Sequence, residues 1–223
     1  MRTLGIETST RRGSVALTQD GAVVGTLEHE EPSAHAERVL GLIERVLADA
    51  GWTRGSLDRV AVGVGPGSFT GLRVGIALAQ GVALGLERPL VGIGSLAAMA
   101  SAVPADDRRT RVTVLDARRS ELFVAAYAPD GTEVFPPSAL GAADARRELG
   151  VALAGHEVVL VGESAPLLGS DWPALAGSTL DLPHAITVAK LGTLADPTLS
   201  SSEPVYVRGP GATLPNLPPS PLG

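Results

Sequence analysis

The chain has 223 residues, 44% of them hydrophobic, and contains no cysteine. The lack of cysteine excludes disulfide bonds, thiol catalysis and cysteine-ligated metal centres. The formal net charge is −6, so the chain lacks the basic surface with which a protein grips nucleic acid by itself.

The first thirty residues predict a strand followed by a β-hairpin. Residues 2–9 (RTLGIETS) predict a strand that ends in a polar turn. Residues 13–30 predict a hairpin closed by Asp20-Gly21, a dipeptide typical of tight turns. This N-terminus carries Glu7 and no long apolar run, so it lacks the pattern of a signal peptide.

An amphipathic helix is predicted over residues 35–50. Ser33 is its predicted N-cap and Gly51 its stop signal. A buried strand is predicted next, over residues 57–65, because nearly all of its residues are apolar. The residues that follow the 3.6-residue period of the helix are Val39, Leu42, Ile43, Val46 and Leu47.

Residues 63–85, GVGPGSFTGLRVGIALAQGVALG, are a glycine-rich turn that runs into a helix of small apolar residues. A phosphate-binding P-loop needs a lysine where Leu72 stands, so the turn is at most a generic anion site at a helix N-terminus. Each glycine inside a helix costs about 0.5–1 kcal/mol relative to alanine. Close approach of a neighbouring backbone, from the same chain or from a second subunit, would compensate for this cost.

The longest uncharged apolar run, Val74 to Leu86, has 13 residues. A helix that spans a bilayer needs roughly 20. We therefore expect a soluble, cytoplasmic protein.

The second half of the chain repeats the pattern of the first. Residues 111–135 match residues 2–25: each stretch has a strand ending in an acid, a polar turn, a second strand and an Asp-Gly turn. Such self-similarity predicts a duplicated domain, with one lobe over residues 1–102 and a second over 103–208. Residues 209–223, rich in proline, are expected to form a flexible tail.

The acids of the two repeats, Glu7 and Asp116, are the candidate cofactor ligands, together with Thr8 and Gly67. Acids at equivalent strand ends that face each other across a cleft would suit magnesium and phosphate, as in a phosphotransferase. A nuclease would need further carboxylates around two metal ions. The alternative is that both acids are remnants of the duplication, paired with the neighbouring arginines Arg11, Arg12, Arg118 and Arg119.

Five segments, in this order, resemble the bacterial TsaB family: LGIETSTRRGSVAL, HAERV, the glycine-rich block, LDARRSELFVAAY and EPVYVR. The resemblance covers roughly residues 2–208. It implies an α/β fold of the duplicated actin-like, RNase H-like (ASKHA) type with two similar lobes. It also implies a non-catalytic role in making threonylcarbamoyladenosine at position 37 of tRNAs. The catalytic relative, TsaD, holds a metal through two histidines four residues apart. In this chain the first of these positions is His35 and the second is Val39. We therefore expect no metal here, and we expect the side chain of His35 to be exposed.

The resemblance further implies partners. A TsaD-type subunit would carry out the threonylcarbamoyl transfer and a TsaE-type ATPase would join the pair, with ATP and metal on those subunits and tRNA reached only through the complex. A homodimer is the alternative assembly, and an ATP-dependent phosphotransferase of the actin-like class is the alternative function. In this family the first two helices form the pairing surface, so the predicted interface residues are His35, Val39, Leu42, Gly71, Gly75, Leu78, Gly81, Val82 and Gly85.

Overall fold

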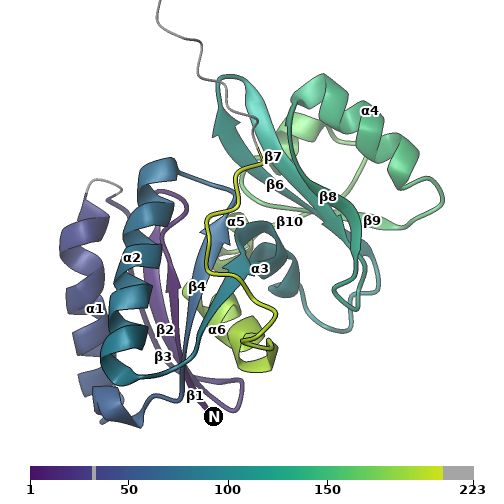
Figure 1. Ribbon diagram of the computed structural model, residues 1–223. Helices are drawn as coiled ribbons and strands as arrows, with labels where there is room; N and C mark the ends of the chain where they lie inside the picture. Colours follow the sequence, from purple (N-terminus) through teal and green to yellow (C-terminus); the bar gives the residue numbers. More distant parts are fainter. Residues whose placement is uncertain (32–33, 208–223) are drawn as a thin grey trace, which may run out of the picture.

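Two five-stranded sheets, one in each half of the chain, form the framework of the protein (Figure 1). The computed structural model describes residues 1–31 and 34–207. The predicted N-cap Ser33 and the predicted tail at 209–223 lie outside these residues.

The first sheet has the strand order β3-β2-β1-β4-β5. Its central strand β1 pairs antiparallel with β2 and parallel with β4. The predicted turn between β2 and β3 is confirmed, since Asp20 and Gly21 both have positive φ, 53° and 82°, as a two-residue hairpin turn requires. The strands are β1 (Arg2–Glu7), β2 (Gly13–Gln19), β3 (Ala22–His29), β4 (Arg59–Gly65) and β5 (Leu90–Gly94).

The second sheet has the order β10-β9-β6-β7-β8, which is the order of the first sheet with each strand replaced by its counterpart. Its central strand β6 pairs antiparallel with β7 and parallel with β9. The predicted duplication is therefore confirmed at the level of topology. The strands are β6 (Thr110–Arg118), β7 (Glu121–Tyr127), β8 (Glu133–Gly141), β9 (Val158–Val161) and β10 (Ala174–Leu175).

Helices α1 (His35–Asp49) and α2 (Phe69–Leu86) cover one face of the first sheet (Figure 1). Alternate residues of β1 point to this face, where Leu4 and Ile6 are fully buried. In the second lobe, α4 (Ala142–Ala152) packs against β7 and β8.

Two helices cross between the lobes. Helix α3 (Ser95–Ser101) follows the first sheet but packs Leu96 and Met99 against residues of the second. Helix α6 (Ala185–Leu194) follows the second sheet but packs on β1 and β4 of the first. The predicted lobe over 103–208 is thus not self-contained, because α6 completes the first lobe. The short helices η2 (Arg54–Ser56), η3 (Ala165–Leu168) and α5 (Ser178–Asp181) lie in the connecting segments.

The last described residues run between the two lobes (Figure 1). We call residues 201–207 the C-terminal strap. The backbone N–H of Val205 donates to the carbonyl oxygen of Val64 at the end of β4, at 2.8 Å. Val207 packs against the buried cluster between α3 and the second sheet, so the strap contacts both lobes.

Candidate functional site

The glycine-rich turn before α2 holds a segment of its own chain. The backbone N–H of Ser68 donates to the carbonyl oxygen of Ser9 at 2.6 Å, and the Thr8 hydroxyl donates to the carbonyl oxygen of Gly71 at 2.8 Å. A Cβ atom at Gly67 would overlap Ser9, and one at Gly71 would overlap Thr8. The glycines therefore admit the turn after β1, and Thr8 and Gly67 serve this internal contact.

Glu7, the first candidate cofactor ligand, is fully buried at the end of β1. One carboxylate oxygen accepts from the backbone N–H of Ser9 at 2.6 Å and the other from the hydroxyl of Ser95 at 3.2 Å. Burial raises the pKa of this carboxyl above its ordinary value, although the hydrogen bonds from Ser9 and Ser95 oppose the shift. Both oxygens are thus committed to residues that join β1 to α3.

Asp116, the second candidate, has a different environment. Its side chain is 49% exposed, and its carboxylate accepts from the backbone N–H of Arg118 at 2.7 Å and pairs with the Arg118 guanidinium at 3.5 Å. Arg118, Arg119 and Ser120 all have positive φ, so the DARRS stretch is a tight turn with a local ion pair. The two acids therefore do not share an environment, as a magnesium site between them would require.

His35 lies inside the first lobe, and the expectation that it is exposed is wrong. Only 2% of it is accessible; its Nε2 lies 2.9 Å from the carbonyl oxygen of Thr10 and its Nδ1 lies 3.2 Å from Nε2 of His29. Because a carbonyl only accepts, Nε2 of His35 carries a proton and donates to Thr10. Within the described ranges, no three or more histidine, aspartate or glutamate side chains group to hold a metal ion.

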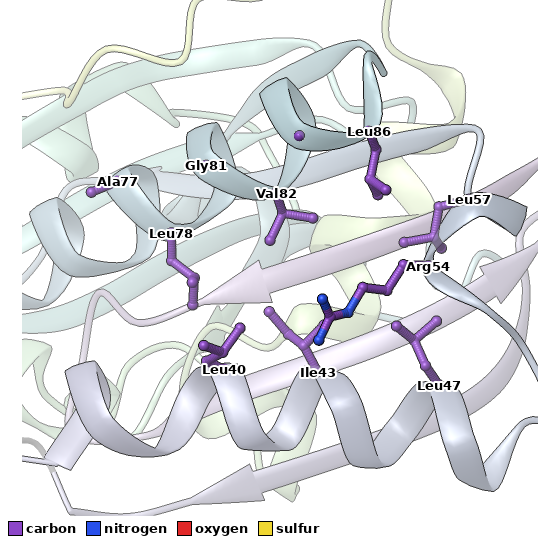
Figure 2. A pocket seen from close by; sticks show the side chains of 11 residues that line it. Leu40, Ile43, Leu47, Arg54, Leu57, Ala77, Leu78, Gly81, Val82 and Leu86 are labelled. Carbon is purple, nitrogen blue, oxygen red and sulfur yellow. The ribbon is translucent and has the colours of Figure 1, made fainter.

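An apolar groove lies between α1 and α2, with a volume of about 340 Å³ (Figure 2). Leu40, Ile43 and Leu47 of α1 line one wall, and residues of α2 line the other. Among the described residues, Arg54 is the one charged member of the lining, and its guanidinium pairs with Glu44. The lining on α2 consists of Ala77, Leu78, Gly81, Val82, Gly85 and Leu86.

The α2 wall of the groove exposes a ridge without side-chain bulk. Ala77, Gly81 and Gly85 are spaced by four residues and are all exposed, so they lie on one line along the helix. Outside the backbone of α2 itself, a Cβ atom at Gly81 or Gly85 would meet no described atom within 4 Å. The backbone of α2 is thus open to close approach from outside, which is the property that glycine confers on a helix surface.

Four of the nine predicted interface residues line this groove: Leu78, Gly81, Val82 and Gly85. Leu42 is half-buried against the core of the first lobe. The prediction is wrong for the other four, because they are buried within their own chain and have no surface to offer a partner: His35, Val39, Gly71 and Gly75.

Sequence reasoning also missed part of the groove. Leu40 is 45% exposed. In the sequence it is an apolar residue outside the periodic apolar stripe of α1, and this position could have indicated that it faces outward. Arg54 and Leu57 lie in the connection after α1, outside the two helices that were considered. No local pattern marks them as groove residues, because the fold of this connection brings them there.

Helix α2 alone among the described helices is long and apolar enough to cross a membrane by length and composition. A third of that stretch is buried inside the molecule, where it packs on β4. A core helix with one face on its own sheet and an apolar outer face has the same composition.

Comparison with known proteins identifies relatives of the chain. Residues 23–165 match the model of a family described as TsaD, tRNA N6-adenosine threonylcarbamoyltransferase. The chain is 41% identical over 131 residues to the tRNA threonylcarbamoyladenosine biosynthesis protein TsaB of Escherichia coli, a match that covers 58% of this chain and 56% of that protein. It is 30% identical to the TsaB protein of Haemophilus influenzae over 92% of both chains.

Solved structures agree with these relationships. YeaZ from Pseudomonas aeruginosa superposes with a TM-score of 0.76 at 26% identity, covering 92% of this chain and 99% of that one. The activator of 2-hydroxyisocaproyl-CoA dehydratase from Clostridium difficile superposes with a TM-score of 0.55 at 9% identity over 86% of this chain and 94% of that one, which shows the shared fold alone. The predicted two-lobed, actin-like α/β fold is confirmed.

Proposed function

The chain belongs to the TsaB family, and we propose that it acts in the biosynthesis of threonylcarbamoyladenosine in tRNA as the non-catalytic partner of a TsaD-type subunit. In this proposal the groove between α1 and α2 is the docking surface. The partner holds the active site, where the threonylcarbamoyl group is transferred to N6 of adenosine 37.

The observation that carries the proposal is the open ridge of Gly81 and Gly85 beside an apolar groove. The groove offers apolar side chains, namely Leu78, Val82 and Leu86 of α2 and Leu40 of α1. Burial of such apolar surface drives association. Because a TsaD family model matches residues 23–165, a TsaD-type partner has a related lobe with related helices. Two similar helix pairs then pack face to face around the ridge.

The non-catalytic part of the proposal draws on the surroundings of the candidate catalytic residues. Glu7 and Thr8 are engaged in internal hydrogen bonds, and the helix that would present two histidines has His35 and Val39, both buried. ATP and metal therefore belong to the TsaD-type subunit and a TsaE-type ATPase. With a net charge of −6, the chain reaches tRNA through the complex, in the cytoplasm.

The test is the mass of the species in solution. The full chain is mixed at micromolar concentration with the TsaD-type subunit of its source organism and measured by light scattering after gel filtration. We expect a heterodimer with the natural chain and separate species with Gly81→Leu, whose side chain enters open space in the free protein but fills the docking surface. Gly150→Leu is the matched control, since Gly150 is also an exposed helical glycine with open space around it, in the second lobe.

Three results would contradict this assignment. Natural chain and partner that stay separate would exclude pairing, and a heterodimer that survives Gly81→Leu would place the interface elsewhere. Tight binding of ATP and magnesium by the isolated chain in calorimetry would instead favour the phosphotransferase. Measured alone, the chain also shows whether a second copy occupies the groove in the absence of the partner.

A further inference from the structure

Two aromatic side chains of this chain stand out because they are exposed and touch each other. The chain has three phenylalanines, two tyrosines and two tryptophans. Phe69, the first residue of α2, is 53% exposed and Tyr206 of the C-terminal strap is 50% exposed, whereas the other five are buried or half-buried. The two ring centroids lie 5.5 Å apart. The guanidinium of Arg73 covers a face of Phe69 at 3.8 Å from the ring centroid.

The position of Tyr206 is set by the backbone of the strap. Val205, its neighbour, donates its N–H to the carbonyl oxygen of Val64 at 2.8 Å. Earlier in the strap, the carbonyl oxygen of Ser201 lies so close to Gly92 of β5 that a Cβ atom there would overlap it. The strap is thus fitted to the edge of the first lobe, and the exposed ring is held in place over the start of α2.

This aromatic cluster continues the docking surface described above. Phe69, Arg73, Ala77, Gly81 and Gly85 follow one another at intervals of four residues along α2, and all five are exposed. Residues at this spacing form a ridge that runs obliquely across a helix surface, so this exposed row crosses the outer side of α2 from the aromatic cluster to the groove. The last three line the groove, so the aromatic cluster lies at the N-terminal end of this exposed ridge and the groove lies at its C-terminal end.

Arg73 adds a charge to the N-terminal end of this ridge. Its Nε donates to the Tyr206 hydroxyl at 3.4 Å, and within residues 1–31 and 34–207 no carboxylate lies within ion-pair distance of it. A guanidinium held over an aromatic ring is well placed to accept a carboxylate from a partner.

We propose that Phe69, Arg73 and Tyr206 form an anchor for the same protein partner that docks on the groove, and that the C-terminal strap is therefore part of the docking surface. The partner contributes an apolar side chain packed on the two rings and an aspartate or glutamate paired with Arg73. Tyrosine and arginine are enriched among the residues that dominate binding energy at protein interfaces, and phenylalanine is enriched in interfaces generally. This inference rests on the proposed function, because it extends the same interface.

A protein partner fits this cluster better than RNA does. Non-specific RNA binding requires several cations along the backbone path; among the described residues the cluster contains one, Arg73, and the chain has a net charge of −6. The guanidinium of Arg73 covers one face of Phe69, which leaves less ring surface for a stacked nucleobase.

The experiment compares dissociation constants for the TsaD-type subunit, measured by calorimetry with the full chain. Tyr206→Ala is expected to weaken binding roughly tenfold or more, as removal of an interface anchor does. Tyr206→Phe keeps the ring and is expected to retain most of the affinity. Arg73→Gln is expected to weaken binding and to reduce its dependence on salt concentration, because it removes one ion pair. Leu194→Ala, at an 83% exposed position on α6, is the control and should bind as the natural chain does.

The outcomes separate this inference from the proposed function. If the natural chain does not bind the subunit, the proposed function fails. If it binds and Gly81→Leu abolishes binding while Tyr206→Ala binds normally, the groove is the interface but the anchor is not, and the inference is overturned. An affinity for tRNA in fluorescence anisotropy that falls with Tyr206→Ala, while affinity for the subunit stays unchanged, would also overturn it. A loss of affinity in Tyr206→Ala that Tyr206→Phe shares would show that the ring is not the anchor.

Discussion

At the scale of the residue, the surroundings of Glu7 explain how an acid can stand at the end of a central strand. Its carboxylate accepts hydrogen bonds from Ser9 and Ser95, and a Cβ atom at Gly63 would overlap it. A buried polar group without hydrogen-bond partners lowers the free energy of unfolding. The hydrogen bonds from Ser9 and Ser95 reduce this penalty for Glu7. Glu7 thus ties the turn after β1 to the first residue of α3, where the two lobes meet.

The raised pKa of Glu7 predicts a particular dependence of stability on pH. Because the folded state binds this proton more tightly than the unfolded chain, the contribution to stability is complete below the ordinary value of 4.5 and is lost as pH rises through the folded-state pKa. Glu7→Gln cannot ionise and keeps an acceptor for Ser9. We expect its free energy of unfolding to rise relative to that of the natural chain between pH 4 and pH 9.

Urea unfolding across this range measures the difference. Asp116→Asn is the control, because it also removes one carboxylate, at the equivalent but exposed position of the second repeat. A Glu7→Gln variant whose stability stays parallel to that of the natural chain at every pH would show that burial of Glu7 does not penalise its charge.

At the scale of the element, α2 uses its glycines in two ways. In the N-terminal half, Gly71 and Gly75 face Thr8 of the same chain, and a Cβ atom at either would overlap it. In the C-terminal half, Gly81 and Gly85 face open space. The sequence allowed close contact of this helix either with its own chain or with a second subunit. The N-terminal half contacts its own chain, and the C-terminal half leaves its backbone open to approach from outside.

The same substitution should have opposite effects in the two halves. Gly71→Ala places a methyl group against the carbonyl oxygen of Thr8, and we expect it to destabilise the fold by about 1–3 kcal/mol. The added methyl group of Gly81→Ala meets no described atom outside α2, and alanine replaces glycine in a helix interior, so we expect a gain of about 0.5–1 kcal/mol. Denaturant unfolding of the two variants measures both, and each serves as the control for the other. Equal effects would mean that the contact with Thr8 does not restrict the N-terminal half.

At the scale of the whole molecule, the lobes are joined by exchanged helices. Ala16, Ala185 and Ala189 form one buried cluster between the first sheet and α6, so this face is built of small residues that permit close packing. The strap and the ion pair between Arg11 and Glu163 add further links between the halves. Each lobe of the structure therefore includes a helix from the other half of the sequence.

This exchange predicts that the first half of the chain does not fold alone. A fragment of residues 1–102 lacks α6 and exposes the face of the first sheet that Ala16 and Ala61 line. We expect it to show no cooperative unfolding transition and to bind a hydrophobic dye, whereas the full chain unfolds cooperatively. Circular dichroism during thermal unfolding tests this. A fragment that unfolds cooperatively would show that α6 is dispensable for the first lobe.

By itself, the sequence determined the local elements and the duplication. The Asp-Gly turns, the helix after the first hairpin and the match of residues 2–25 with 111–135 depend on patterns within a few neighbouring residues, and such patterns are legible in the chain. Four interface candidates on α2 now line the groove because helical spacing placed them on one face.

Tertiary structure decided everything that depended on distant contacts. Whether a glycine of α2 faced inward turned on Thr8, which lies 63 residues before Gly71 and is invisible to any local pattern. The burial of His35 depended on Thr10 and His29, and the crossing of α6 onto the first sheet on strands more than a hundred residues away. The physical reason is that the sequence around a small residue does not indicate which residue will pack against it. That neighbour depends on how the whole chain packs.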